Sequence, residues 1–306
     1  MIDKPRLRSN IILLVTAFIW GTAFVAQKAG EGIGSFAFIA IRNLLAIVVM
    51  LPIMFILAKR RGEKFNILGT NDPKGKKITL FAGVIVGLIL FAGCALQQFG
   101  ILNTDSVGKA GFITTLYIVL VPILGIFIKK KVNWIVFISV AISSVGLYLL
   151  CIDGEFKLST GDLLLLGCAL MFAIHILVVD HFVSSVNTIH FAWLQYAVCA
   201  VLGFIAMFIF EKPDITLILQ AYFPLLYAGV LSSAIGFTLQ IVAQKNMNPT
   251  VASLIMCLES VFSVLGGYVV FGDILTTREL IGCGMMFVAI ILAQIPFGKP
   301  KLDSVK

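Results

Sequence analysis

The stretch Ile78–Phe99, ITLFAGVIVGLILFAGCALQQF, holds no charged residue over 22 positions. A helix needs about 20 consecutive apolar residues to cross the hydrocarbon core of a bilayer. Nine further stretches have the same character. The sequence therefore predicts an all-α integral membrane protein with ten transmembrane helices, at 10–27, 34–57, 78–99, 106–128, 132–151, 161–180, 189–209, 218–243, 249–271 and 278–296.

The composition of the whole chain favours the same class. Of its 306 residues, 60% are hydrophobic and 12% are charged, and the mean hydropathy is +1.06. Soluble chains are about half apolar and a quarter charged, so a soluble globular enzyme, a disordered chain and a coiled coil are all disfavoured. The longest connection, 58–77, is too short and too basic to form a domain of its own.

Motifs for a metal or a nucleotide are not found. The six cysteines lie inside or at the edges of expected helices and form no C-x-x-C pair, which disfavours both a disulfide framework and a zinc site. The stretch Gly69–Lys76 lacks the spacing of a P-loop, and the glycines at 30, 32 and 34 follow no strand. We therefore expect no cofactor, no metal and no ATP-driven pump.

Lysine and arginine are unevenly placed along the chain. With ten helices both termini lie on one side, and the segments on that side carry 17 of the 23 basic residues, against 5 on the other side. Cytoplasmic loops are rich in Lys and Arg, so we expect cytoplasmic N- and C-termini, including a tail at 298–306, in a cell membrane. The net charge of +8 then marks orientation and contact with lipid headgroups, and nucleic acid is not expected as a partner.

Several short signals concern helix ends and packing. Ser106 is expected to cap the fourth helix, Pro249 to occupy the first turn of the ninth, and Thr276 with Glu279 to form a capping box before the tenth. The G-x-x-x-G pattern at 83–87 predicts close packing against another helix.

The second half of the sequence repeats the first half faintly. Leu96-Gln97 and Leu239-Gln240 lie near the ends of the third and eighth helices, and Ser35-Phe36-Ala37 resembles His190-Phe191-Ala192 at the starts of the second and seventh. Each half has an odd number of helices, so homologous halves must insert with opposite orientation. This predicts two inverted five-helix repeats, 1–152 and 160–297, as in secondary transporters with a midplane site.

The chain resembles the drug/metabolite transporter superfamily, and within it the ten-helix EamA-type permeases. The resemblance covers roughly residues 9–297 and is carried by Trp20-Gly21-Thr22, Arg42, Leu258-Glu259 and Phe271-Gly272-Asp273-Ile274-Leu275-Thr276 with Gly282. It implies a transporter of small metabolites, often amino acids or related compounds, and frequently an exporter.

Two residues depart from the pattern of that family. The family commonly has proline after the glutamate of the ninth helix, where this chain has Ser260, and glutamate where this chain has Asp273. No proline therefore kinks the ninth helix at this point, and Gly266-Gly267 is the alternative source of flexibility.

Two ionisable residues lie deep in expected helices, at similar depth. Ionisable groups at the bilayer centre are costly, and each needs a structural or functional reason. In the functional interpretation, Glu259 lines the pathway and meets a substrate amine or takes up a proton, while Arg42 meets a carboxylate. In the structural alternative, the two side chains pair with each other or cap broken backbone.

Other candidates for substrate binding are uncharged. Trp20 and Tyr117 lie at mid-depth, away from the interfacial belts, where each can stack on a substrate and donate a hydrogen bond. Thr22, Ser232 and Ser233 can add hydroxyl groups at that level. The alternative for the aromatic residues is core packing, and for the hydroxyls it is bonding to helix carbonyls.

Two glutamines and one histidine complete the set. Gln97 and Gln240 occupy equivalent places in the two repeats, so inversion puts them on opposite faces, as expected of paired gate elements rather than of one site. His175 lies near the inner end of the sixth helix, where it is a candidate for proton coupling or a partly hydrated residue at a helix end.

The leading hypothesis is a secondary transporter that works by alternating access, with a small-molecule substrate, the lipid bilayer as its surroundings and protons as one possible coupling ion. The alternative from another class is an intramembrane lipid-modifying enzyme, and a channel or a receptor ranks lower. An enzyme would need clustered ligands or nucleophile–base pairs, and the sequence has no H-E-x-x-H motif and no pair of membrane carboxylates.

Overall fold

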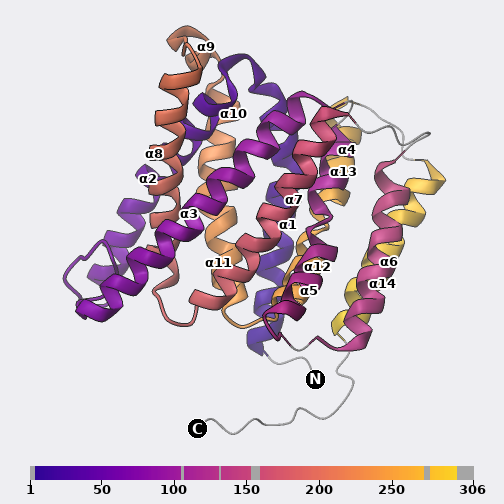
Figure 1. Cartoon of the computed structure of the whole chain (residues 1–306), viewed down its shortest axis with the longest axis horizontal. Helices are drawn as coiled ribbons and strands as arrows, with labels where there is room; N and C mark the ends of the chain where they lie inside the picture. The colour runs from indigo at the N-terminus through magenta and orange to yellow at the C-terminus, as the bar shows by residue number, and fades with distance from the viewer. Residues whose placement is uncertain (1–3, 105–106, 131, 153–158, 272–275, 295–306) are drawn as a thin grey trace, which may run out of the picture.

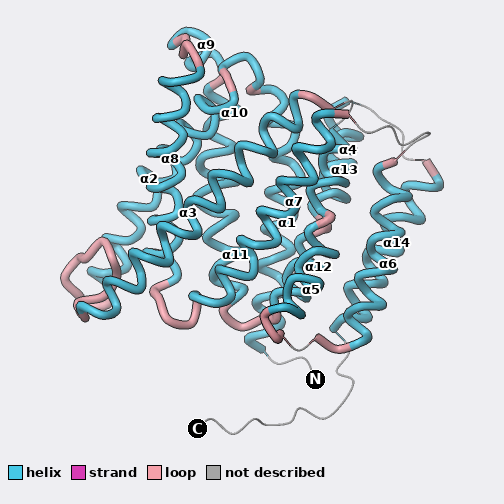
Figure 2. Tube along the Cα trace, in the orientation of Figure 1, coloured by secondary structure: helices cyan, strands magenta, loops and turns pink. Residues whose placement is uncertain are grey.

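The computed structural model describes residues 4–104, 107–130, 132–152, 159–271 and 276–294, and these residues form helices joined by short loops, with no strand among them (Figure 2). Four predictions fall wholly or partly outside the described residues. They are the cap at Ser106, the four residues Gly272-Asp273-Ile274-Leu275 of the family motif, the end of the second repeat after 294, and the tail at 298–306.

The helices of the first half are α1 Lys4–Ala29, η1 Glu31–Ile33, α2 Ser35–Arg60, α3 Pro73–Leu102, α4 Val107–Thr115, α5 Tyr117–Phe127 and α6 Trp134–Cys151. Those of the second half are α7 Thr160–Phe182, α8 Thr188–Phe210, α9 Ile215–Gln220, α10 Tyr222–Leu226, the π-helix η2 Tyr227–Phe237, α11 Thr238–Gln244, α12 Pro249–Met256, α13 Glu259–Phe271 and α14 Thr277–Gln294.

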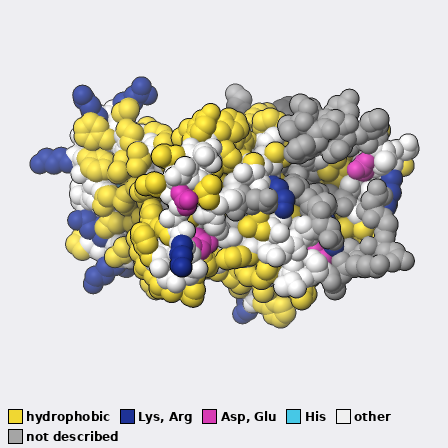
Figure 3. All heavy atoms as spheres, turned by 90° about the horizontal axis from the view of Figure 1, so that it is seen from above, with side chains coloured by type: hydrophobic (Ala, Val, Ile, Leu, Met, Phe, Trp, Pro, Cys, Tyr) yellow, Lys and Arg dark blue, Asp and Glu magenta, His cyan; other side chains and the backbone are white. Residues whose placement is uncertain are grey.

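The prediction of a multi-pass membrane protein is confirmed. Among the described residues, nine segments are long and apolar enough to cross a membrane, and α6, at the place of the fifth predicted span, is a shorter apolar helix. Large apolar side chains are exposed along these helices, as expected where lipid replaces water. Figure 3 shows one end of the molecule, where hydrophobic side chains predominate and Lys and Arg gather toward one edge.

The predicted helix ends that can be compared are also confirmed. Asn248 caps α12 with its side-chain oxygen, and Pro249 occupies the first turn. At the start of α14, the Thr276 backbone N–H donates to the Glu279 carboxylate at 2.6 Å, and the Glu279 N–H donates to the Thr276 hydroxyl at 3.3 Å. These bonds satisfy backbone donors that have no partner inside the helix.

Two of the predicted helices are broken near their middles, which the sequence did not predict. The span 106–128 divides into α4 and α5 at Leu116, and the span 249–271 divides into α12 and α13 at Cys257-Leu258. No proline occupies either junction. Short polar side chains satisfy carbonyls there instead: the Thr115 hydroxyl donates to Gly111 at 2.7 Å, and the Ser260 hydroxyl donates to Cys257 at 2.7 Å.

The span predicted at 218–243 is also not one regular helix. It consists of α9, α10, the 11-residue π-helix η2 and α11. A π-helix is wider than an α-helix and changes which side chains face a neighbour, and such segments are frequent at functional sites. In this chain, η2 places Ser232 and Ser233 toward α1 and α2.

The two halves pack against each other in a reciprocal pattern. In the first half, α3 packs against α7 and α8; in the second half, η2 and α11 pack against α1, and η2 packs against α2. The helices α2 and α8 pack together, as do α6 and α14 at one edge of the bundle (Figure 1). The helix α7 begins at the end of the bundle opposite to the start of α1, so the halves run in opposite directions.

Close helix packing at the G-x-x-x-G pattern is confirmed. A Cβ atom added to Gly83 would lie 2.6 Å from Cβ of Leu194, and one added to Gly87 would lie 2.6 Å from Cβ of Val198, both on α8. The glycines therefore let α3 and α8 approach more closely than residues with side chains would allow.

Candidate functional site

A cavity lies in the middle of the bundle, and the space between its lining atoms, open solvent included, amounts to about 480 Å³. It is lined by residues of both halves, from α1, α2, α3, α5, α7, η2, α11 and α13. Its polar lining residues are all buried, and they are Gln27, Arg42, Gln97, Tyr117, His175, Ser232, Gln240 and Glu259. Of the ten candidate residues from the sequence, eight line this cavity: Trp20 and the seven polar residues just named other than Gln27.

Arg42 approaches the cavity from α2 and is only 3% exposed. Its Nε donates to the Ser233 hydroxyl at 2.9 Å, and its Nη2 donates to the Ser232 hydroxyl at 3.1 Å. A guanidinium has five N–H donors, so these two bonds leave three. No carboxylate among the described residues forms an ion pair with Arg42. Its positive charge is held by neutral hydroxyl groups of the π-helix.

Glu259 is the first residue of α13, directly after the break in the ninth span, and is also 3% exposed. The hydroxyl of Tyr117 donates to its Oε1 at 3.3 Å. Tyr117 is likewise the first residue after the break in the fourth span. The two broken helices therefore meet at their breaks, and the start of α13 places the positive end of a helix dipole at the Glu259 carboxylate.

The structural alternative for the two charged residues is not what the structure contains. Among the residues that the structure describes, no ion pair joins Arg42 to Glu259, although both line the same cavity. The hydrogen-bond partner of the Glu259 side chain is a phenol and not a broken backbone. Both ionisable side chains are therefore buried, and neither has a partner of opposite charge in the part of the chain that the structure describes.

The aromatic lining of the cavity centres on Trp20. Its Nε1 donates to the backbone carbonyl of Ser232 at 3.2 Å, and its ring lies 4.7 Å from that of Phe237. Phe24 and Phe172 add apolar surface. The motif Trp20-Gly21-Thr22 thus holds α1 against η2, and at Gly21 an added Cβ would lie only 2.6 Å from Cβ of Phe262, so α1 also packs closely against α13.

Two of the predicted substrate-binding residues do not line the cavity. The Thr22 hydroxyl donates to the carbonyls of Phe18 and Ile19 at 2.9 and 3.1 Å and contacts the hydroxyl of Tyr227. Ser233 touches Arg42 and is not part of the cavity wall. The alternative stated for such hydroxyls, bonding within the membrane to carbonyls and neighbouring helices, is what the structure shows for Thr22.

The two glutamines and the histidine all line the cavity. Gln97 lies near the end of α3 and Gln240 in the first turn of α11, and both line the one cavity, whereas the sequence placed them on opposite faces and not in one site. His175 is 1% exposed, and its Nε2 lies 3.0 Å from Oε1 of Gln195. The expectation of a partly hydrated histidine at a helix end is therefore wrong, because α7 continues to Phe182 and neighbouring helices cover the ring.

Sequence reasoning missed several lining residues. Gln27 is the last residue of the predicted helix 10–27, and its polar side chain is the one signal that could have identified it. Phe24, Phe172 and Phe237 are three of 25 phenylalanines, and nothing in the sequence separates them from those that face lipid. Among the described residues, no group of three or more His, Cys, Asp and Glu side chains is arranged to hold a metal ion.

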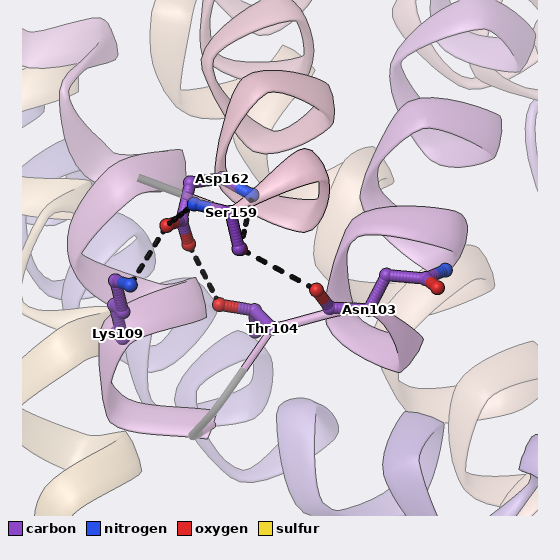
Figure 4. A network of polar contacts seen from close by, with 5 residues as sticks. All are labelled: Asn103, Thr104, Lys109, Ser159 and Asp162. Atoms are coloured by element: carbon purple, nitrogen blue, oxygen red, sulfur yellow. Dashed lines mark hydrogen bonds and ion pairs between the residues drawn. The ribbon is translucent and has the colours of Figure 1, made fainter. Parts of the chain in front are cut away.

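A polar network closes the end of the bundle opposite to the termini (Figure 4). Asp162, in the first turn of α7, is fully buried; it forms an ion pair with Lys109 of α4 at 2.7 Å and accepts a hydrogen bond from Thr104 at 2.7 Å. It also accepts from the Ser159 backbone N–H at 2.7 Å, which completes a capping box. One carboxylate thus joins the loop after α3, α4 and α7.

A second ion pair joins the same helices at the other end. Lys130, just after α5, pairs with Asp180 in the last turn of α7. The broken helix formed by α4 and α5 is therefore attached to α7 near both of its ends.

Comparison with known proteins relates the whole chain to membrane transporters. The profile of the EamA-like transporter family matches residues 7–152 and 159–294, once in each half. An uncharacterized transporter of Archaeoglobus fulgidus is 29% identical over 300 residues, which cover 95% of this chain and 87% of the relative. A crystal structure of a protein that is 16% identical superposes with a TM-score of 0.76, over 94% of this chain and 96% of that one, and so shares the fold.

Proposed function

The chain belongs to the EamA-like transporter family, and on this basis we propose that it is a secondary transporter of small zwitterionic metabolites, with amino acids as the leading class. One observation carries the substrate class. Two buried side chains of opposite charge, Arg42 and Glu259, line a single cavity without pairing with each other.

A charged side chain in a low-dielectric interior is stable only with an opposite charge or with hydrogen-bond partners. Arg42 has three N–H donors left for a carboxylate, and the Glu259 carboxylate has acceptor sites left for an ammonium group. A zwitterion supplies both partners at once. Trp20, Tyr117 and Ser232 contribute ring surface and hydroxyl groups for the remainder of the substrate, while Thr22 and Ser233 support the wall from behind.

The transport cycle that we propose is alternating access. The bundles 1–152 and 160–297 rock about the cavity, and Gln97 and Gln240, at equivalent places in the two repeats, act as gates. In the empty carrier a proton on Glu259 takes the place of the substrate amine, with His175 as the second candidate for proton coupling. Both termini face the cytoplasm of a cell whose plasma or inner membrane holds the carrier.

Radiolabelled counterflow in proteoliposomes tests this proposal. The purified chain is reconstituted and screened for exchange of amino acids, nucleosides and sugars. We expect saturable exchange of at least one amino acid and none of the neutral sugars, because a sugar cannot neutralise either charge. Exchange of nucleosides or sugars alone would contradict the zwitterion, and silence across the panel together with turnover of a lipid would favour the intramembrane enzyme.

A further inference from the structure

The side-chain amide of Gln240 lines the cavity without a protein partner. Gln240 is 1% exposed, and its Oε1 has no hydrogen bond to any described residue. Buried polar atoms are almost always paired, so an exception in a cavity indicates that the partner is a molecule that enters it. Arg42 and Glu259 already account for the two charges of the proposed substrate. The amide is left over for a third group.

Two features together distinguish Gln240 from the other buried glutamines: it lines the cavity, as Gln27 and Gln97 also do, and unlike theirs its side chain has a buried oxygen without a described partner. The Oε1 atoms of Gln98 and Gln244 also lack a described partner, but neither residue lines the cavity. Each has its Nε2 anchored on a backbone carbonyl, Gln98 on Gln27 at 3.4 Å and Gln244 on Ile176 at 3.1 Å. No such anchor holds Gln240 to another described residue. Its amide is therefore free to turn toward a ligand.

We infer that Gln240 is a specificity-determining residue that hydrogen-bonds the side chain of the substrate, and that the favoured substrates are amino acids whose side chain ends in a hydroxyl or a carboxamide. This inference rests on the proposed function and goes one step beyond it. A primary amide both donates and accepts, so it matches either of these groups and offers nothing to a methyl group in its place.

The neighbourhood of Gln240 supports a neutral partner. The cavity wall also contains Phe237 and the ring of His175, whose Nε2 is within hydrogen-bond distance of Gln195. Among the described residues, the carboxylate and the guanidinium of the cavity are Glu259 and Arg42, on α13 and α2, and both have the roles given above. A substrate group that meets Gln240 therefore meets an uncharged polar side chain in a wall that also contains aromatic residues and other uncharged polar residues. Sites of this kind reject an analogue that lacks the hydrogen-bonding group, because their own polar atom then stays unpaired.

The test compares pairs of amino acids of similar size that differ in this one group. Counterflow is measured for threonine against valine, tyrosine against phenylalanine, and glutamine against methionine, with wild-type protein and with Gln240→Met. We expect wild-type protein to prefer the polar member of at least one pair by about tenfold, the effect of one good hydrogen bond. In Gln240→Met that ratio falls to about one, and because the readout is a ratio within each pair, a change in the overall rate of exchange does not affect it.

Gln244→Met is the matched control. Gln244 lies one turn further along α11, is equally buried and has an unpartnered Oε1, but it does not line the cavity. Its substitution should leave the polar-to-apolar ratio at the wild-type value. A ratio that changes equally in both variants would overturn the inference, because a general effect of removing a buried amide would then explain it.

The remaining outcomes separate this inference from the proposed function. If wild-type protein exchanges no amino acid, the proposed function fails. If it exchanges amino acids without preferring a polar side chain, or keeps its preference in Gln240→Met, the inference fails and the proposed function stands. If Gln240→Met does not insert or fold, Gln240→Asn replaces it, since this variant shortens the same amide by one methylene. Its ratio must also fall below the wild-type value, and an unchanged ratio would overturn the inference.

Discussion

At the scale of single residues, Arg42 and Glu259 are held by different neutral partners, serine hydroxyls in one case and a tyrosine hydroxyl in the other. Such partners orient a charge without cancelling it. An ion pair between the two residues would have given a more conventional membrane core, but it would have left no charge for a ligand. The separate partners keep both charges available in a buried place.

Neutralising the two charges one at a time should change selectivity in opposite ways. With an amino acid that the carrier exchanges, Glu259→Gln should lower counterflow at least tenfold, because a neutral amide cannot pair with an ammonium group, and should remove the preference for that amino acid over its deaminated acid. Arg42→Gln should instead remove the preference over the decarboxylated amine. Competition counterflow with the three compounds measures both effects.

Glu211→Gln is the control for the loss of a glutamate. Glu211 lies outside the cavity and accepts hydrogen bonds from the backbone N–H groups of Phe36 and Ala37 at 2.8 and 2.9 Å, at the start of α2. Its substitution can alter stability but should leave the selectivity unchanged. Wild-type rates in Glu259→Gln would reduce Glu259 to a structural role.

At the scale of elements, the sequence predicted where helices cross the membrane but not where they break. Span positions follow from runs of apolar residues, which the sequence displays directly. At the breaks at Leu116 and at Cys257-Leu258, threonine and serine hydroxyls donate to backbone carbonyls. The same residue types also occur inside unbroken helices, so they do not reveal a break in the sequence. Eight of the candidate site residues could be found because a polar or amphipathic residue stands out in an apolar span. The lining phenylalanines and the π-helix could not, because the sequence carries no comparable signal for them.

Proline substitutions test the break in the ninth span. Ser260 lies in the first turn of α13, where its backbone N–H donates to the Cys257 carbonyl at 3.2 Å, three residues back, and not to a carbonyl four residues back as inside an α-helix; Ser263 lies one turn further in. We expect Ser260→Pro to shift the unfolding temperature by less than about 4 °C. Ser263→Pro should lower the free energy of unfolding by about 3 kcal/mol or more, and so lower the unfolding temperature further. Thermal unfolding in detergent measures both. Equal destabilisation by the two prolines would mean that the helix is continuous through residue 260.

At the scale of the whole molecule, the charge pattern predicts one orientation in the membrane. The loops at the end of the bundle where α1 begins and α14 ends include the α2–α3 connection with its seven lysines and arginines over 58–77. The two-repeat architecture was predictable because an odd number of helices per half leaves inversion as the only arrangement for homologous halves. The polar residues of the cavity between the halves were predictable from the sequence. Its apolar lining was not, because that lining depends on how each helix is rotated about its own axis, which weak amphipathic patterns do not determine.

Epitope insertion tests the orientation. Gly32, in the three-residue helix η1 between α1 and α2, and Gly62, in the loop after α2, lie at opposite ends of the bundle. Neither has atoms near the position of an added side chain, so both sites should accept an inserted tag. We expect a tag after Gly62 to be protected in intact cells and a tag after Gly32 to be labelled from outside, because basic loops stay in the cytoplasm. The reversed labelling pattern would contradict cytoplasmic termini.

The ion pairs of Lys109 with Asp162 and of Lys130 with Asp180 have a mechanical consequence for the broken fourth span. A broken helix that is attached to its neighbour near both ends is expected to bend most at the break. Here the break lies at Leu116, and the next residue is Tyr117, whose hydroxyl reaches Glu259. We therefore expect a movement of α7 to shift both α4 and α5. The largest displacement should fall on Tyr117, whose side chain contacts the buried Glu259 carboxyl group.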